Sequence, residues 1–253
     1  MTLTVAGEPL LAYLLASLRI VSWLLVVPPF TGRTVPTMAK VVLALGLAFA
    51  VVPSGDSIPT GTGALLLNAG TQVLVGLLLG FVTYLMFSAV AVAGSLIDLF
   101  GGFALAQAFD PLSMSQNSIF GKFHQLLATT LLFVSGAHLL VIGGLLRTFH
   151  FLPLGTSPEF AGASDILITA FGLFFTTAVQ IALPMIAVLF VADLALALLT
   201  KVAPQLNAIT VMFPVKIGLT LLLLGLSFPV LPGAVERLAE LANEAMAALV
   251  GAG

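Results

Sequence analysis

The sequence contains no cysteine, and only 7% of its 253 residues are charged. The absence of cysteine excludes disulfides, thiolate metal sites, iron–sulfur clusters and cysteine nucleophiles. The shortage of charge says more, because soluble domains carry about 25% charged residues and use polar groups to cover their surface. The surface of this protein must therefore face lipid or other apolar protein.

Apolar residues predominate in the sequence: 60% of the residues are hydrophobic, and the mean hydropathy is +1.22. The formal net charge is −2, and the few Lys and Arg are scattered, which favours neither nucleic acid nor a polybasic lipid anchor as a partner. Glu8 precedes the first apolar run without any Lys or Arg, which argues against a cleavable signal peptide. No polar linker divides the chain, so we expect one domain over residues 1–253.

The apolar runs predict transmembrane helices. Backbone groups in hydrocarbon must bond within a helix or across a closed barrel, and these runs are too long for barrel strands. Clusters of proline and glycine separate the runs. We therefore predict an all-α integral membrane protein, with apolar helices over residues 9–27, 41–52, 63–97, 123–149, 166–199 and 207–228.

Three of these segments have unusual features. The run 41–52 is short for a membrane span, whereas 63–97 is longer than one upright span needs. Pro184 should bend the helix 166–199.

The last segment, 233–250, is predicted to be an amphipathic helix, because charged residues recur at helical spacing opposite an apolar face. The charged residues are Glu236, Arg237, Glu240 and Glu244, and the apolar ones are Val235, Leu238, Leu241 and Leu249.

No arrangement typical of an enzyme is present. The three histidines, His124, His138 and His150, belong to no metal-binding motif. A nucleophile elbow, a phosphate-binding loop and a dinucleotide fingerprint are also missing from the sequence. We therefore expect no catalytic, cofactor-binding or metal-binding residue, and no enzymatic activity.

Charges inside apolar runs are the most informative polar residues, because a charge at bilayer depth costs a few kcal/mol or more. Arg19 lies deep in the first predicted helix. One interpretation is a buried ion pair at a subunit contact, with Asp98 or Asp193 as partner; the other is a side chain that snorkels to the interface. We favour the ion pair, because Arg19 is more than two turns from the helix end at Pro28.

Other small and charged residues could serve in helix packing or in transport. Gly76 and Gly80 form a small-xxx-small pair that would let another helix approach closely, and Gly94 lies further along the same run. The charged residues Asp98, Lys201 and Lys216 could form a relay in a secondary transporter for a small solute or proton. They could equally mark the places where segments enter water or a subunit groove, which we favour because they share no helix face.

The segment from Gly101 to Gly121 mixes glycines, bulky apolar residues and turn formers between two long apolar runs. At membrane depth such backbone is tolerated only inside protein or beside a water-filled cavity. It could be a plug that closes a pore, or an ordinary loop in water. The residue types alone leave both interpretations open.

A set of residues spread from about Ala12 to Leu226 resembles the FliR family of flagellar export-gate proteins and its virulence-secretion relatives. The order and the spacing of the set carry the resemblance. Its members are Arg19, Pro28-Pro29-Phe30, Val35-Pro36, Lys40, Gly76, Gly80, Ala93-Gly94, Asp98, Gly101, Asp110-Pro111, Phe120, Pro184, Phe213-Pro214 and Lys216.

This resemblance implies long, kinked helical hairpins that pack with partner subunits into a helical export gate. The family assembles with FliP and FliQ, contributes one asymmetric member to the ring, and lies beside the FlhA and FlhB export components. The resemblance further implies that unfolded proteins pass through a closed pore in the bacterial inner membrane. The pore would lie at the flagellar basal body, with part of the assembly on the periplasmic side.

The resemblance also implies roles for particular residues. The segment Gly102–Gly121 would be the plug, in which Phe and Met side chains exclude water and ions yet part for a polypeptide. Its candidate residues are Phe109, Asp110, Pro111, Met114, Ile119, Phe120 and Gly121. Candidates for subunit packing or ion pairing are Arg19, Gly76, Gly80, Gly94, Asp98 and Lys216.

Overall fold

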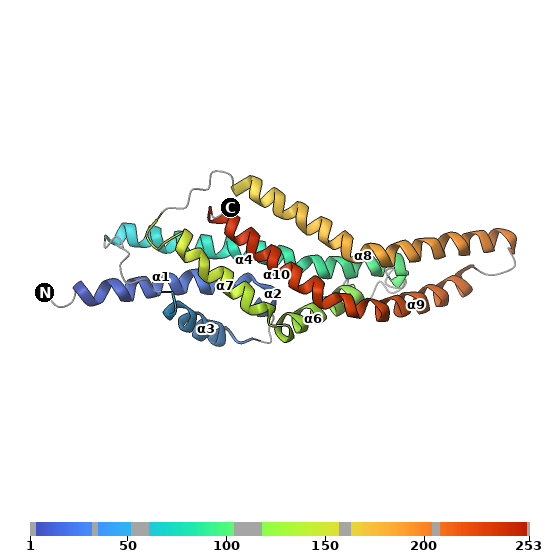
Figure 1. Ribbon diagram of the computed structural model, residues 1–253, viewed down its shortest axis with the longest axis horizontal. Coiled ribbons are helices and arrows are strands. Elements are labelled where there is room, and N and C mark those ends of the chain that lie inside the picture. The colour runs from blue at the N-terminus through green and yellow to red at the C-terminus, as the bar shows by residue number, and fades with distance from the viewer. Residues whose placement is uncertain are drawn as a thin grey trace, which may run out of the picture. The chain divides into compact units, whose positions relative to one another are not determined.

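The computed structural model describes residues 4–31, 35–51, 61–103, 118–156, 163–203 and 208–251. Throughout these ranges the regular secondary structure is helical, with no strand (Figure 1), which confirms the predicted all-α class. The chain forms two compact units. Unit 1 comprises Met1–Met86, Gly136–Phe171 and Leu238–Gly253, and unit 2 comprises Phe87–Ser135 and Gly172–Arg237.

Unit 1 contains the first helices of the chain. Helix α1 spans Thr4–Val26, the short α2 spans Pro28–Thr31, and α3 spans Thr37–Phe49. Helix α3 packs against α1, where the Tyr13 hydroxyl donates to the Leu45 carbonyl at 2.9 Å. At about 1.5 Å per residue α3 is about 20 Å long, shorter than the hydrocarbon core of about 30 Å.

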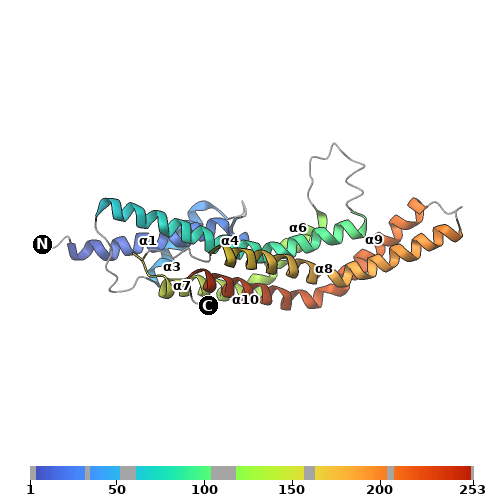
Figure 2. The ribbon, with the colours of Figure 1, turned by 90° about the horizontal axis from the view of Figure 1, so that it is seen from above.

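Two further helices contribute to unit 1. The first part of α4 (Thr62–Gly101) runs beside α1, as both views show (Figures 1 and 2). Helix α7 (Ala137–Phe151) meets the end of α10 (Leu231–Leu249). A Cβ atom built at Gly144 of α7 would overlap the side-chain oxygen of Asn243, so these two helices approach closely.

Unit 2 has a core around Phe120, the second residue of α6 (Ile119–Val134). The end of α4, the middle of α8 (Ala163–Val202) and α9 (Ala208–Ser227) contribute the other core side chains. A short 3-10 turn, η1 (Phe228–Val230), joins α9 to α10. The buried core residues around Phe120 are Ala93, Ile97, Ala182, Met185 and Leu224.

One predicted helix, 123–149, is wrong, because the structure divides this stretch between α6 and α7. Helix α6 ends at Val134 and α7 begins at Ala137. Gly136 lies between them with a φ of +77°, a conformation that glycine adopts easily and that commonly ends a helix. By contrast, α8 continues through Pro184 as a single helix whose axis changes direction along its length (Figure 1).

Four helical stretches among the described residues are long and apolar enough to cross a membrane: Gly7–Val26, Thr62–Gly101, Ser164–Val202 and Met212–Leu249. The α6–α7 pair would make a fifth if it were one bent span. The four differ in how much of their surface the chain itself covers. The most apolar windows of the first two are 50% and 61% buried, but those of the last two only 17% each.

Candidate functional site

The structure buries Arg19 completely, at 0% exposure, in unit 1. Its guanidinium donates from Nε to the Gln72 side-chain oxygen at 2.7 Å and from Nη2 to the Leu152 carbonyl at 2.9 Å. A longer contact, 3.5 Å, joins Nη1 to the Thr148 carbonyl, and the guanidinium carbon lies 4.1 Å from the centre of the Phe149 ring. Arg19 thus ties α1 to α4 and to the last turn of α7.

The predicted ion pair of Arg19 with Asp98 or Asp193 is wrong. The acceptors around the guanidinium are neutral oxygens, and each aspartate has other partners. The positive charge of Arg19 is instead compensated by the last turn of α7, because the last turn of a helix carries unpaired carbonyls and a partial negative charge. The polar cluster extends along α4, where Gln72 donates to the Asn68 side-chain oxygen at 3.0 Å.

Gly76 and Gly80 lie where α1 crosses α4. A Cβ at Gly76 would overlap the carbonyl oxygen of Arg19, and one at Gly80 would lie 3.1 Å from the carbonyl oxygen of Trp23. The close helix approach that the small-xxx-small pair suggested thus occurs within the chain. Packing of these glycines against another subunit stays a prediction.

A second buried charge, Asp98, lies near the end of α4 in unit 2 and is 2% exposed. Its carboxylate accepts a short hydrogen bond from the Ser118 hydroxyl and one from the backbone N–H of Phe120, which lies 3.2 Å from both oxygens. Ser118 is the N-cap of α6, and its hydroxyl oxygen accepts from the Gly121 N–H at 2.7 Å. A carboxylate is well placed here, because the first turn of a helix presents unpaired N–H groups and a partial positive charge.

Glycines bring the two helices together at this point. A Cβ at Gly94 of α4 would overlap the Phe120 carbonyl oxygen and lie 2.8 Å from the Cα of Gly121. A Cβ at Gly121 would in turn lie 2.8 Å from the hydroxyl oxygen of Ser95. The backbones of α4 and α6 therefore touch, which places Asp98 within reach of the first turn of α6.

Phe103 and Phe120 join the two ends of the proposed plug segment. Their rings meet edge to face with centroids 4.8 Å apart, and Phe120 is 5% exposed in the unit 2 core. Phe120, which the resemblance placed at the constriction, is thus packed in the core of unit 2, and its role at a constriction stays a prediction. Its neighbour Ile119 is 57% exposed and can meet another surface. The remaining constriction candidates, Phe109, Asp110, Pro111 and Met114, lie outside the described residues.

The structure does not assemble the relay proposed for a transporter. Lys216 of α9 pairs with Asp193 of α8 at 2.7 Å, while Asp98 is bonded to the start of α6. Lys201 is exposed in the last turn of α8. The interpretation of these residues as a transport pathway is therefore not supported.

Among the described residues, no three His, Asp or Glu side chains lie close enough together to bind a metal ion. His124 of α6 is 2% exposed, and its Nδ1 lies 2.8 Å from the Phe120 carbonyl oxygen. It is thus bonded one turn back along its own helix.

Three residues that contact Arg19 or Asp98 were not predicted from the sequence. Ser118 could have been found, because a serine just before an apolar run is a common N-cap. Gln72 could also have been found, since an amide inside an apolar run needs a partner. Nothing in the sequence indicated Phe149, whose contact with Arg19 depends on how α7 folds back.

Buried charges placed at helix ends, close helix crossings at glycines and four long apolar stretches define the class: an all-helical integral membrane protein. The sequence profile of bacterial export proteins, family 1, matches residues 10–242. The chain therefore belongs to this family of bacterial export proteins.

Relatives from distant bacteria agree with this assignment. The chain is 33% identical to the flagellar biosynthetic protein FliR of Escherichia coli K12, over 87% of this chain and 85% of the relative. It is 32% identical to FliR of Bacillus subtilis, over 95% and 96%. It is also 28% identical to the Yop proteins translocation protein T of Yersinia pestis, over 86% and 85%. The protein is a membrane component of a type III export apparatus.

Proposed function

We propose that this chain is the single asymmetric subunit of an export gate that it builds with FliP-like and FliQ-like proteins. The gate would lie in the bacterial inner membrane at the flagellar basal body, partly on the periplasmic side, next to FlhA-like and FlhB-like components. Unfolded proteins would pass through it, and the subunit would act sterically, without catalysis. Two exposed apolar stretches support an assembly role, because α8 and α9 leave most of their surface uncovered by the chain itself.

We further propose that the segment Gly102–Gly121 closes the gate. The observation that carries this proposal is that its two ends are fixed together. Phe103 near the start of the segment packs on Phe120 near its end, and Asp98 holds the N-terminus of α6. A segment whose two ends are held together can adopt fewer conformations than a free segment. It therefore loses less conformational entropy when it closes the pore. Phe109, Asp110, Pro111, Met114 and Ile119 would form the constriction, and Gly121 and Phe120 its anchor.

The partner proposal is tested by purification. The tagged full-length chain, expressed from its own operon and extracted in mild detergent, should carry FliP-like and FliQ-like subunits at fixed ratios. Mass spectrometry of the isolated complex identifies the subunits and gives their numbers. Recovery of the chain alone from cells in which export works would contradict the proposal.

The plug proposal is tested by deleting residues 106–115, which leaves the anchoring residues Phe103, Ser118 and Phe120 in place. We expect the complex to assemble and to conduct ions in a planar bilayer, because a narrow ring of apolar side chains excludes ions by dewetting. A matched variant replaces the same residues with a Gly/Ser chain of equal length, which keeps the connection but removes the bulky side chains. Ion conductance equal to that of the wild type in both variants would rule out a plug.

A further inference from the structure

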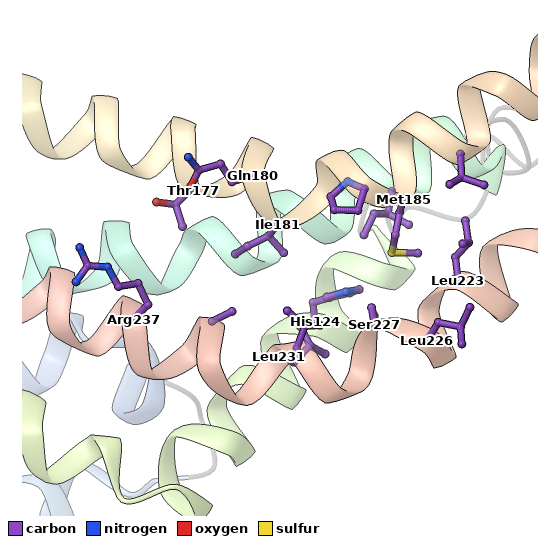
Figure 3. A pocket seen from close by; sticks show the side chains of 15 residues that line it. His124, Thr177, Gln180, Ile181, Met185, Leu223, Leu226, Ser227, Leu231 and Arg237 are labelled. Carbon is purple, nitrogen blue, oxygen red and sulfur yellow. The ribbon is translucent and has the colours of Figure 1, made fainter.

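A cavity of 480 Å³ lies within unit 2, and side chains from α4, α6, α8, α9 and α10 line it (Figure 3). This volume is in the range of about 300–1,000 Å³ that is usual for small-molecule sites. The cavity is partly open to the surface of unit 2. The volume therefore fits a small molecule, or one chain of a larger one.

The two ends of the cavity differ in polarity. Thr177 and Gln180 of α8 and Arg237 of α10 lie at one end, whereas Leu223 and Leu226 lie at the other (Figure 3). The cavity thus offers hydrogen bonds and a positive charge at one end, and mostly apolar contacts, with Ser227 beside Leu226, at the other. Such polarity matches an amphipathic molecule.

Pro184 changes the backbone hydrogen bonding of α8 beside the cavity. Proline has no N–H, so the backbone carbonyl of Gln180, four residues earlier in α8, loses its usual helical donor. Both residues line the cavity. Arg237 makes an interaction of its own, but a guanidinium has five N–H donors and can bind a phosphate oxygen as well.

The length of the cavity agrees with that of one lipid chain. Thr177 at the polar end and Met185 toward the apolar end (Figure 3) are about 12 Å apart along α8, at about 1.5 Å per residue. One leaflet of a bilayer contributes about half of a hydrocarbon core that is about 30 Å thick. An acyl chain that starts at the polar end would therefore reach the apolar end.

The cavity borders a surface that lipid can reach. Its rim residues Val188, Leu226 and Val230 are 41%, 68% and 71% exposed. They belong to the two stretches that the chain covers least. A lipid in the surrounding bilayer can enter from this side without crossing the core of unit 2.

We propose that this cavity binds one glycerophospholipid, with an acyl chain between α8, α9 and α10 and its phosphate at Arg237. Met185 and Leu231, both buried, would form the floor under the chain. The proposal depends only on the location of the protein in a membrane. The binding tests use the isolated chain, so their failure is distinguishable from failure of the proposed export gate.

Native mass spectrometry of the full-length chain in mild detergent tests this proposal. Phosphatidylethanolamine, phosphatidylglycerol and diacylglycerol with identical acyl chains are added separately, and bound molecules are counted. We expect one retained phospholipid per chain and about tenfold weaker retention of diacylglycerol, because the charged hydrogen bond to phosphate is missing. Equal retention of all three lipids would overturn the role of Arg237.

Two variants locate the binding site. Ala234→Trp fills the cavity and should abolish retention, while Ala187→Trp places the same bulk on an exposed position of α8 and should not. Arg237→Gln should weaken retention of both phospholipids about tenfold, whereas Arg147→Gln removes an exposed charge of α7 and should leave retention unchanged. Equal retention by the two tryptophan variants would overturn the proposal.

Photo-crosslinking keeps the proposal testable if Ala234→Trp does not fold. A phospholipid with a photoactivatable group in its acyl chain is added to the wild-type chain, and labelled peptides are sequenced. We expect labels on the peptides that contain Met185 and Leu223. Labels confined to other helices would contradict the proposal, as would a side chain of a partner subunit filling the cavity in the assembled complex.

Discussion

At the scale of single residues, Arg19 and Asp98 are buried charges that each lie against a helix end. Arg19 donates to carbonyls at the end of α7, and Asp98 accepts from the Phe120 N–H and the Ser118 hydroxyl at the start of α6. Each charge therefore meets a helix end of opposite partial charge, which compensates part of the cost of removing it from water. Neither arrangement needs an ion pair.

Replacement of Arg19 should destabilise the chain strongly. Arg19→Ala leaves the Gln72 and Leu152 oxygens without donors, at about 1–3 kcal/mol each, and leaves a cavity as well. Arg19→Lys should recover only part of the loss, because an ammonium cannot reproduce the planar fork. Thermal unfolding in detergent, followed by the fluorescence of the single tryptophan, Trp23, measures the effect.

Arg147 provides the control for this experiment, because it is exposed on α7. Arg147→Ala should change the free energy of unfolding by less than about 0.5 kcal/mol. Equal effects of the two alanine substitutions would show that Arg19 does not hold α1, α4 and α7 together.

Removal of the α6 cap should loosen the anchor of the proposed plug. Ser118→Ala should cost about 1 kcal/mol, the usual loss for an N-cap serine, and Asp98→Ala should cost more, because Phe120 N–H also loses its acceptor. Hydrogen exchange at the first turn of α6 measures both. Thr130→Ala, at an exposed position of the same helix, is the control, and protection unchanged in Asp98→Ala would contradict the assignment.

At the scale of elements, glycines decide how closely helices approach. Gly76→Ala forces a methyl group against the Arg19 carbonyl, so α1 and α4 must separate, and we expect a loss of at least about 1–3 kcal/mol. Gly70→Ala on the same helix meets no atom within 4 Å and should stabilise the helix by about 0.5–1 kcal/mol. Unfolding of the two variants in detergent compares them directly, and a stable Gly76→Ala would refute the close crossing.

The hairpin of α8 and α9, which run side by side in both views (Figures 1 and 2), is joined by Asp193 and Lys216. Lys216→Met leaves a carboxylate unpaired among apolar helices, which is costly in a membrane. The exchange Asp193→Lys with Lys216→Asp should restore most of the stability, with a coupling of about 0.5–3 kcal/mol between the two sites. A double-mutant cycle on complex yield measures this coupling, and additive effects would show that the pair contributes nothing.

At the scale of the whole molecule, the shortage of polar surface determines where the protein can exist. Four apolar helical stretches, two of them mostly uncovered by the chain itself, require lipid, detergent or partner protein around them. We expect the chain to remain in the membrane fraction after an alkaline wash and to leave it only with detergent. Fractionation and immunoblotting measure this distribution, and release by alkali alone would contradict integral insertion.

The sequence determined the class of the protein and most of its helices. Composition excluded a soluble domain, and long apolar runs between proline and glycine clusters indicated helices, because these signals act locally along the chain. The break at Gly136 was missed, since a glycine within an apolar run is also compatible with a continuous helix.

Tertiary structure alone decided the partners of the buried charges. The contact of Arg19 with Leu152 joins residues 133 positions apart, and that of Asp98 with Phe120 depends on two glycines that bring α4 to α6. A sequence shows which side chain needs compensation, but the helix end that supplies it is known only once the helices have packed. The same holds for the cavity in unit 2, because its lining combines α4 and α6 with α8, α9 and α10, which follow much later in the chain.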